Sequence, residues 1–182
     1  MSVENGHAPM TFHDEFVKRF RFVHGHADVL GLLADASCLE RAAVALAEPF
    51  SEADVSKVVA VEARGFILGT AVALRLGAGL VPIRKEGSVH PGEKIECRTP
   101  RDWRGQESVL RVQRAALSIG DRALLVDDWA ETGSQALTAR ALVEECGATY
   151  VGLSILVDQL SSEVRGRLAP VSAVAQHDEL GG

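Results

Sequence analysis

Residues 123–135 read Ala-Leu-Leu-Val-Asp-Asp-Trp-Ala-Glu-Thr-Gly-Ser-Gln, and this stretch decides the fold class. Its four leading apolar residues follow the turn Gly120-Asp121 and predict a buried parallel strand. Asp127 and Asp128 come next, so we expect them at the carboxyl end of that strand, where open α/β sheets bind ligands. The amides that follow precede a helix-like run and suit a phosphate. The segment therefore favours a phosphorylated ribose as ligand. The alternative interpretation is an ordinary strand-to-helix turn with surface acids.

A second strand-turn-helix pattern begins at residue 57. A short β-branched strand over residues 57–61 leads into the turn Glu62-Ala-Arg-Gly65. Arg64 is expected at the same edge of the sheet as the two acids, and Gly65 would let the backbone approach a ligand closely. The pattern thus predicts a second ligand-binding turn.

Two further cations end the next predicted strand, Arg84 and Lys85. Together with Arg64 they could neutralise a pyrophosphate, because arginine forms forked hydrogen bonds and lysine acts as a point charge. The alternative is that these cations pair with local carboxylates such as Glu62 and Glu86.

Strands alternate with helices along the whole chain, which predicts a mostly parallel, doubly wound α/β sheet in a single domain over residues 1–182. We expect residues 1–35 to form a flexible start and a small N-terminal hood. Residues 86–107 contain glycine, proline and charged residues without hydrophobic period, which predicts a flexible lid loop. The expected helices cover residues 38–47, 66–76, 134–146 and 161–168, and the expected strands cover 57–61, 79–83, 108–112, 123–126, 149–157 and 171–175.

Composition narrows the class of protein. The net charge of −6 over 182 residues argues against a nucleic-acid-binding surface, so an anionic ligand must be held by a local cluster of cations. The three cysteines are far apart and form no CxxC motif, which favours a reducing, cytoplasmic setting. No apolar run approaches the length needed to span a membrane.

The two turns and the cations carry a resemblance to a known family. Residues 57–85, with Glu62-Ala-Arg-Gly65 and Arg84-Lys85, and the signature at 123–135 resemble type I phosphoribosyltransferases, in particular the adenine type. The resemblance covers roughly residues 28–170. It implies a cytoplasmic enzyme of purine salvage that joins adenine to phosphoribosyl pyrophosphate, giving AMP and pyrophosphate. It also implies Mg²⁺ as cofactor and a homodimer, with no nucleic-acid or membrane partner.

The resemblance implies roles for individual residues. Asp127 and Asp128 would hold the ribose hydroxyls, and Arg64 and Lys85 would stabilise the leaving pyrophosphate. No protein side chain is assigned as a direct metal ligand, since Mg²⁺ would bridge pyrophosphate and hydroxyl oxygens. A non-proline cis peptide is implied at the Ala63–Arg64 bond. The residues implied to bind substrate are Ala63, Arg84, Ala130, Thr132, Gly133, Ser134, Gln135 and Val29.

Three segments depart from the family pattern. The family's Phe-Arg-Asp-Val/Ile reads His26-Ala-Asp-Val29 here, which alters the hood around the base. The lid run Tyr-x-Leu-Glu-Tyr-Gly reads Thr99-Pro-Arg-Asp-Trp-Arg-Gly105, leaving Asp102 or Trp103 as replacements. The phosphate loop has Glu131 where the family has alanine. These departures leave two other hypotheses open: the same chemistry on a 6-oxopurine or unusual purine, and a non-catalytic protein that senses phosphoribosyl pyrophosphate or a purine.

Glu131 is the sharpest of these departures. A carboxylate close to a phosphate is repelled, so its side chain is expected to point toward the ribose C1 and the base. Hypoxanthine-guanine phosphoribosyltransferases carry an aspartate at the equivalent position, thought to exchange a proton with the purine. Glu131 is therefore a candidate catalytic acid/base, and a solvated loop residue is the equal alternative.

Overall fold

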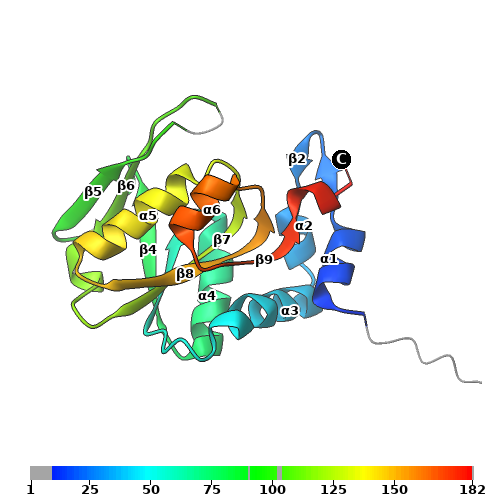
Figure 1. The fold of residues 1–182 in the computed structure, drawn as a ribbon, viewed down its shortest axis with the longest axis horizontal. Helices are drawn as coiled ribbons and strands as arrows, with labels where there is room; N and C mark the ends of the chain where they lie inside the picture. The colour runs from blue at the N-terminus through cyan, green and yellow to red at the C-terminus, as the bar shows by residue number, and fades with distance from the viewer. Residues whose placement is uncertain (1–9, 90, 102–103, 182) are drawn as a thin grey trace, which may run out of the picture.

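The computed structural model describes residues 10–89, 91–101 and 104–181 and shows an α/β fold built on a central sheet (Figure 1). Its strands are β3 (Lys57–Val61), β4 (Gly79–Lys85), β5 (Lys94–Arg98), β6 (Val109–Gln113), β7 (Arg122–Ala130), β8 (Thr149–Asp158) and β9 (Val171–Gln176). The helices are α1 (Phe12–Arg19), α2 (Val29–Leu33), α3 (Ala36–Ala47), α4 (Arg64–Leu76), α5 (Ser134–Glu145) and α6 (Ser162–Leu168), with short 3₁₀ turns η1 (Glu48–Phe50), η2 (Arg114–Ala116) and η3 (His177–Glu179).

The seven strands lie in the order β5-β6-β4-β3-β7-β8-β9. The run from β4 to β9 is parallel, whereas β5 and β6 are antiparallel to their neighbours. The prediction of a mostly parallel, doubly wound sheet is confirmed.

The central strands β3, β7 and β8 contain runs of consecutive buried residues, and because successive side chains point to opposite sides of the sheet, both faces are buried there. Val58 and Leu124 belong to the hydrophobic core beneath α3 and α4. Their chain neighbours Val59 and Leu125 belong to the core beneath α5 and the end of α6. The apolar runs read from the sequence are therefore central strands covered by helices on both sides.

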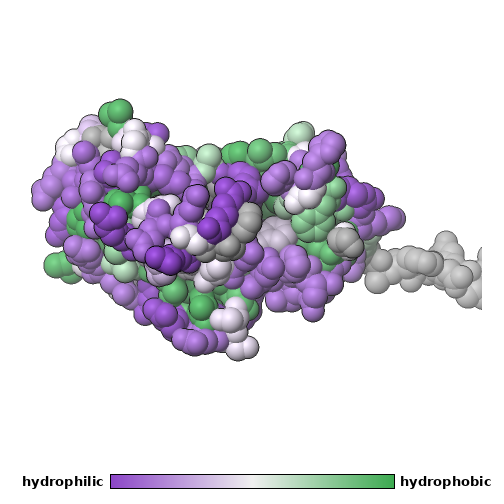
Figure 2. Space-filling model, turned by 90° about the horizontal axis from the view of Figure 1, so that it is seen from above, coloured by the Kyte–Doolittle hydropathy of each residue, from purple (hydrophilic) through white to green (hydrophobic). Residues whose placement is uncertain are grey.

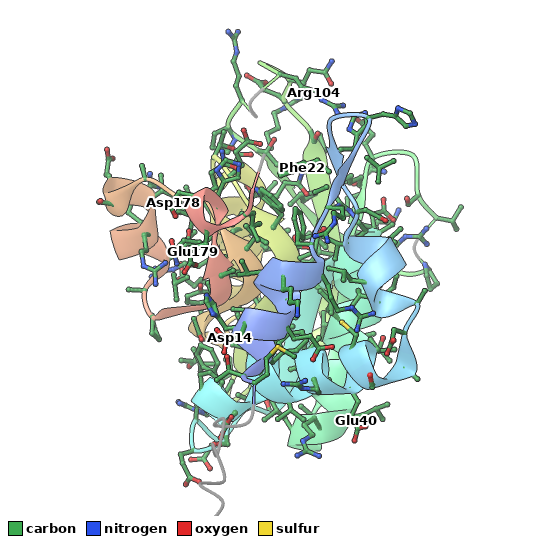
Figure 3. The ribbon with its side chains drawn as sticks, turned by 90° about the vertical axis from the view of Figure 1, so that its right-hand side faces the viewer. Asp14, Phe22, Glu40, Arg104, Asp178 and Glu179 are labelled. Carbon is green, nitrogen blue, oxygen red and sulfur yellow. The ribbon has the colours of Figure 1, made fainter. Side chains whose placement is uncertain are left out.

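A small N-terminal unit stands beside the sheet as the predicted hood. It consists of α1, the hairpin of β1 (Phe22–Val23) and β2 (His26–Ala27), and α2. His13 on α1 is hydrogen-bonded to Glu179 of the C-terminal turn at 3.0 Å, so the two ends of the described chain meet (Figure 3). Of the flexible start expected within residues 1–35, residues 1–9 lie outside the described residues, whereas a helix already begins at Phe12, capped by Thr11.

The structure corrects two boundaries. The predicted lid loop 86–107 contains the strand β5, whose alternation of exposed and half-buried residues was masked by its charged residues; Ile95 and Cys97 pack toward the core while Lys94, Glu96 and Arg98 are exposed. The strand β7 continues through Ala130 because it stays paired with β8 as far as Asp158. Asp127 and Asp128 thus lie within the strand rather than beyond it.

The β5–β6 connection and the hood project from the same end of the molecule. Figure 3 shows Arg104 of this connection and Phe22 of the hood both toward that end. Asp102 and Trp103, the candidate replacements for the family's lid residues, lie outside the described residues. Within the described part of the chain, no helix is long and apolar enough to cross a membrane.

Candidate functional site

A cleft of about 250 Å³ opens at the carboxyl edge of the parallel strands. Seen from above, this end of the molecule is mostly hydrophilic (Figure 2). The cleft brings together eleven of the thirteen residues predicted for the site: Ala63, Arg64, Lys85, Asp127, Asp128, Ala130, Glu131, Thr132, Gly133, Ser134 and Gln135. The remaining two, Arg84 and Val29, are not among its lining residues.

One wall of the cleft is the N-terminus of α5. Gly133 precedes the helix with φ of +70°, a left-handed conformation that glycine adopts without strain. A Cβ there would also meet Val164 at 2.5 Å, so packing against α6 excludes any side chain. The residue offers no side-chain cap, and the first amides of α5 face the cleft with the positive end of the helix dipole. This end of the helix suits a phosphate group.

The acid pair lies beside the turn that follows β3. Asp128 is buried, and its Oδ2 lies 2.6 Å from Nη1 of Arg64. Asp127 Oδ1 accepts a hydrogen bond from the backbone N–H of Asp128 at 2.9 Å. A Cβ on Gly65 would come within 3.0 Å of Asp127 Oδ1, so glycine is what allows this close approach. The two segments singled out in the sequence are thus in direct contact.

Electrostatics at this pair favour a cationic or hydrogen-bonding ligand. The pKa of the Asp127 carboxyl is raised well above its usual range, first because burial disfavours its charged form and then because Asp128 is negative beside it. Arg64 opposes both effects. Asp127 therefore carries an energetic cost in the free protein that a bound ligand would relieve.

The turn itself departs from one expectation. A non-proline cis peptide is present, but it is the Glu62–Ala63 bond, one residue before the expected Ala63–Arg64 bond. β3 ends at Val61, so the cis bond joins the first two residues of the turn, Glu62 and Ala63. Resemblance located the turn correctly and misplaced the bond within it.

Arg84 is not positioned as predicted. Its Nε donates to Glu62 Oε2 at 3.1 Å and its Nη1 donates to the carbonyl of Val89 at 2.9 Å. Consecutive residues of a strand point to opposite sides, so Arg84 and Lys85 cannot both face the cleft, and Lys85 is the one that does. The alternative, pairing with a local carboxylate, holds for Arg84.

Val29 is also outside the cleft. It is fully buried at the start of α2 and belongs to the core that joins the hood to α3 and α4. Its apolar side chain fits that packing role, and the sequence carries no pattern that separates a buried hood residue from a base-contacting one.

Four lining residues escaped the sequence analysis as site residues: Glu62, Trp129, Ala136 and Leu153. Trp129 is half-buried, and its indole N–H donates to Gln159 at 3.0 Å. Its ring lies edge-on to those of Phe22 in the hood and His177 in the C-terminal turn. A tryptophan at the end of an apolar strand reads as core, and only these contacts from distant segments show that it forms an aromatic wall of the cleft.

Fold and cleft together define a type I phosphoribosyltransferase: a parallel sheet whose carboxyl edge presents an acid pair, an anion-binding helix N-terminus and a cationic turn. Comparison with known proteins agrees. The family described as the phosphoribosyl transferase domain matches residues 40–174, so the chain belongs to the phosphoribosyltransferase family.

Its relatives are adenine phosphoribosyltransferases. The enzyme of Streptomyces coelicolor is 38% identical over 153 residues, 84% of this chain and 82% of its own length. The enzyme of a Nocardioides species is 42% identical over 135 residues, 72% of this chain and 71% of its own.

Solved structures give the same result. The crystal structure of adenine phosphoribosyltransferase from Rhodothermus marinus superposes with a TM-score of 0.80 at 31% identity, covering 91% of this chain and 98% of that one. The Giardia lamblia enzyme, complexed with 9-deazaadenine, gives a TM-score of 0.81 at 26% identity, covering 92% of this chain and 98% of its own.

The raised pKa of Asp127 predicts a stabilising substitution. Below the pKa of an unfolded aspartate both states hold the proton; as the pH rises above it, the unfolded state releases its proton first, so this residue lowers stability. Asp127→Asn should therefore raise the Tm at pH 7, and the gain should vanish near about pH 3. Thermal denaturation across this pH range measures it, with the exposed Glu52→Gln as control. A Tm gain that is equal at both ends of the range would contradict the assignment.

Proposed function

We propose that this protein is an adenine phosphoribosyltransferase of purine salvage, which transfers ribose 5-phosphate from phosphoribosyl pyrophosphate to adenine and releases pyrophosphate. The observation that carries the proposal is the contact between the acid pair on β7 and the cationic turn after β3, beside the open N-terminus of α5. Those three parts match the ribose hydroxyls, the pyrophosphate and the 5-phosphate of one substrate. The adenine phosphoribosyltransferase relatives support adenine as the base.

The chain's residues would divide the work along the substrate. Asp127 and Asp128 accept hydrogen bonds from the ribose hydroxyls, and the amides of residues 131–135 bind the 5-phosphate. Arg64, Lys85 and the backbone at Ala63 hold the pyrophosphate. The ribose carbon becomes cationic as the bond to pyrophosphate breaks, so charge stabilisation on the leaving group lowers the barrier.

Arg64 links binding to this chemistry. In the free protein its guanidinium is paired with the buried Asp128. A pyrophosphate offers a stronger, multiply charged partner, and moving Arg64 toward it releases Asp128 for a ribose hydroxyl. The ion pair thus keeps Asp128 neutralised until substrate replaces it.

The donor set fits Mg²⁺. Carboxylate oxygens are its preferred protein ligands, and it is usually held by one or two of them together with water and substrate phosphates. Asp128 Oδ2 is a buried oxygen whose close partner in the free protein is the Arg64 guanidinium, at 2.6 Å. Asp127 and Asp128 would hold Mg²⁺ through the ribose hydroxyls that they bind, and the ion would supply charge neutralisation on the pyrophosphate oxygens.

Base and lid complete the proposal. Trp129 would form the flat wall for the adenine ring. The parts of the segment 86–107 that lie outside β5 would close over the cleft and exclude water, which protects the activated sugar from hydrolysis. A cytoplasmic location fits the free thiols of Cys38, Cys97 and Cys146.

An assay for pyrophosphate release tests the function. With Mg²⁺ and phosphoribosyl pyrophosphate, adenine should give turnover, and hypoxanthine and guanine should be much poorer substrates. Asp127→Ala with Asp128→Ala should abolish it, because the ribose loses both acceptors. Preference for a 6-oxopurine would establish the alternative base. Tight binding of phosphoribosyl pyrophosphate without turnover of any base would establish the sensing protein instead.

We also propose that Glu131 exchanges a proton with the base. The other three acids of the cleft have partners: Glu62 with Lys85, Ser88 and Arg84, Asp128 with Arg64, and Asp127 with the neighbouring backbone. The carboxylate of Glu131 makes no hydrogen bond or ion pair with any described residue, although it lines the cleft. It is therefore free to accept the proton that the purine loses when its nitrogen bonds to the ribose carbon.

Glu131→Gln keeps the shape of the side chain and removes its basicity. Turnover should fall by at least about tenfold, the low side of the range for positioned acid/base groups, with little change in Tm or in affinity for phosphoribosyl pyrophosphate. Glu145→Gln, an exposed glutamate at the far end of α5, is the matched control. Wild-type turnover in Glu131→Gln would leave Glu131 as a solvated loop residue.

We propose further that the chain forms a homodimer through the outer face of α4 and β4. Ile67, Leu74 and Leu80 are exposed there, with Leu74 79% exposed, next to the site residues that begin α4 and end β4. An apolar centre with a charged rim is typical of such interfaces.

Sedimentation should show twice the mass of one chain for the wild type and a single chain for Leu74→Glu. The control Ile119→Glu, at an equally exposed position on a distant turn, should remain dimeric. A monomeric wild type would refute this interface.

A further inference from the structure

The carboxylate of Glu62 joins two parts of the cleft. Its Oε1 accepts the backbone N–H of Lys85 at 2.6 Å and the hydroxyl of Ser88 at 2.8 Å. Its Oε2 accepts Nε of Arg84 at 3.1 Å. Burial alone would raise the pKa of Glu62, but these three hydrogen bonds outweigh it and the pKa is lowered. Glu62 is therefore an ionised junction whose acceptor sites are used within the protein.

These bonds cross between segments that are distant in sequence. Glu62 is the first residue of the turn that leads to Arg64, whereas Ser88 lies in the connection that leaves β4 for β5. Arg84 extends the link, because its Nη1 also donates to the carbonyl of Val89. The position of residues 86–89 therefore depends on where the Glu62 carboxylate is held.

We infer that Glu62 is a positioning residue that couples pyrophosphate binding at the turn 62–65 to the ordering of the connection 86–89. The inference rests on the proposed function, because it takes pyrophosphate as the ligand of that turn. An anion bound by Arg64, Lys85 and the backbone of the turn would restrict the motion of the turn. Glu62 belongs to that turn, so the motion of its carboxylate, to which Ser88 and Arg84 donate, is restricted as well. By linkage, ordering the connection tightens pyrophosphate binding in the same proportion.

The geometry gives Arg84 and Glu62 a role beside the ligand-binding residues although neither binds the ligand itself. Lys85 lines the cleft, and its backbone N–H donates to Glu62. This hydrogen bond fixes the backbone from which the ammonium group extends. Arg84 points away and fixes the connection instead. One carboxylate thus sets the position of a ligand-binding cation and of the segment that leads toward the β5–β6 hairpin.

Hydrogen exchange with saturating Mg²⁺-pyrophosphate tests the coupling. In the wild type, the amides of residues 86–89 should exchange more slowly when pyrophosphate is present. Ser88→Ala removes one link on the far side of the junction and leaves the turn intact. The pyrophosphate-induced slowing should shrink about fivefold, the size expected for the loss of one hydrogen bond in a coupling network. Ser88→Thr restores the hydroxyl and should restore the effect, and Glu86→Gln in the same segment is the matched control.

Kinetics adds a readout that a merely structural role would not move. Glu62→Gln places an amide N–H against Arg84 and breaks that link, so kcat should fall and the protection of residues 86–89 should be lost while the KM for adenine stays unchanged. A Glu62→Gln variant with wild-type kcat and protection would overturn the inference. Full protection in Ser88→Ala would overturn it as well.

Calorimetry on the same samples separates this inference from the proposed function. A wild type that binds Mg²⁺-pyrophosphate without slowing exchange in residues 86–89 overturns the coupling alone. A wild type that binds no Mg²⁺-pyrophosphate overturns the proposed function and the coupling with it.

Discussion

The parallel pairing of β3 with β7 is the constraint on which the site depends. The register aligns Val58 with Leu124 and Ala60 with Val126, so the two strands end side by side. The turn after β3 therefore meets the acid pair on β7, and a Cβ on Gly65 would come within 3.0 Å of Asp127 Oδ1. A shift in that register would separate Arg64 from Asp128 and divide the ligand-binding groups between two places.

Charge in the cleft is arranged for a ligand rather than for stability. Four acids line it, and one of them, Asp127, has a pKa raised by burial and by its neighbour. Arg64 and the hydrogen bonds to Glu62 offset part of this cost. A site that concentrates like charge lowers the stability of the free protein, and any ligand that binds only the folded state offsets that cost.

Two cations that are adjacent in sequence have different functions because a strand alternates. Lys85 faces the cleft, whereas Arg84 faces Glu62 and Val89. Both residues are cations and were predicted to bind pyrophosphate on that basis. Strand geometry, however, decides which of two neighbouring residues faces the cleft. The resulting link through Glu62 makes the cleft a connected structure, in which the anion-binding turn and the β4–β5 connection share a carboxylate.

The sequence by itself determined the sheet class, the two turns and most of the residues of the cleft, because apolar runs, glycines and acid or base pairs act over a few neighbouring residues. Asp127, Asp128 and the loop to Gln135 all line the cleft, although the two acids lie within β7 and not beyond its end. Only the tertiary structure decided that Arg84 and Val29 lie outside the cleft and that Trp129 is one of its walls. It also revealed β5 within the expected loop and assigned the cis bond to Glu62–Ala63. These features depend on strand register and on contacts between the hood, the sheet and the C-terminal turn, which come from segments far apart in the chain and leave no local pattern in the sequence.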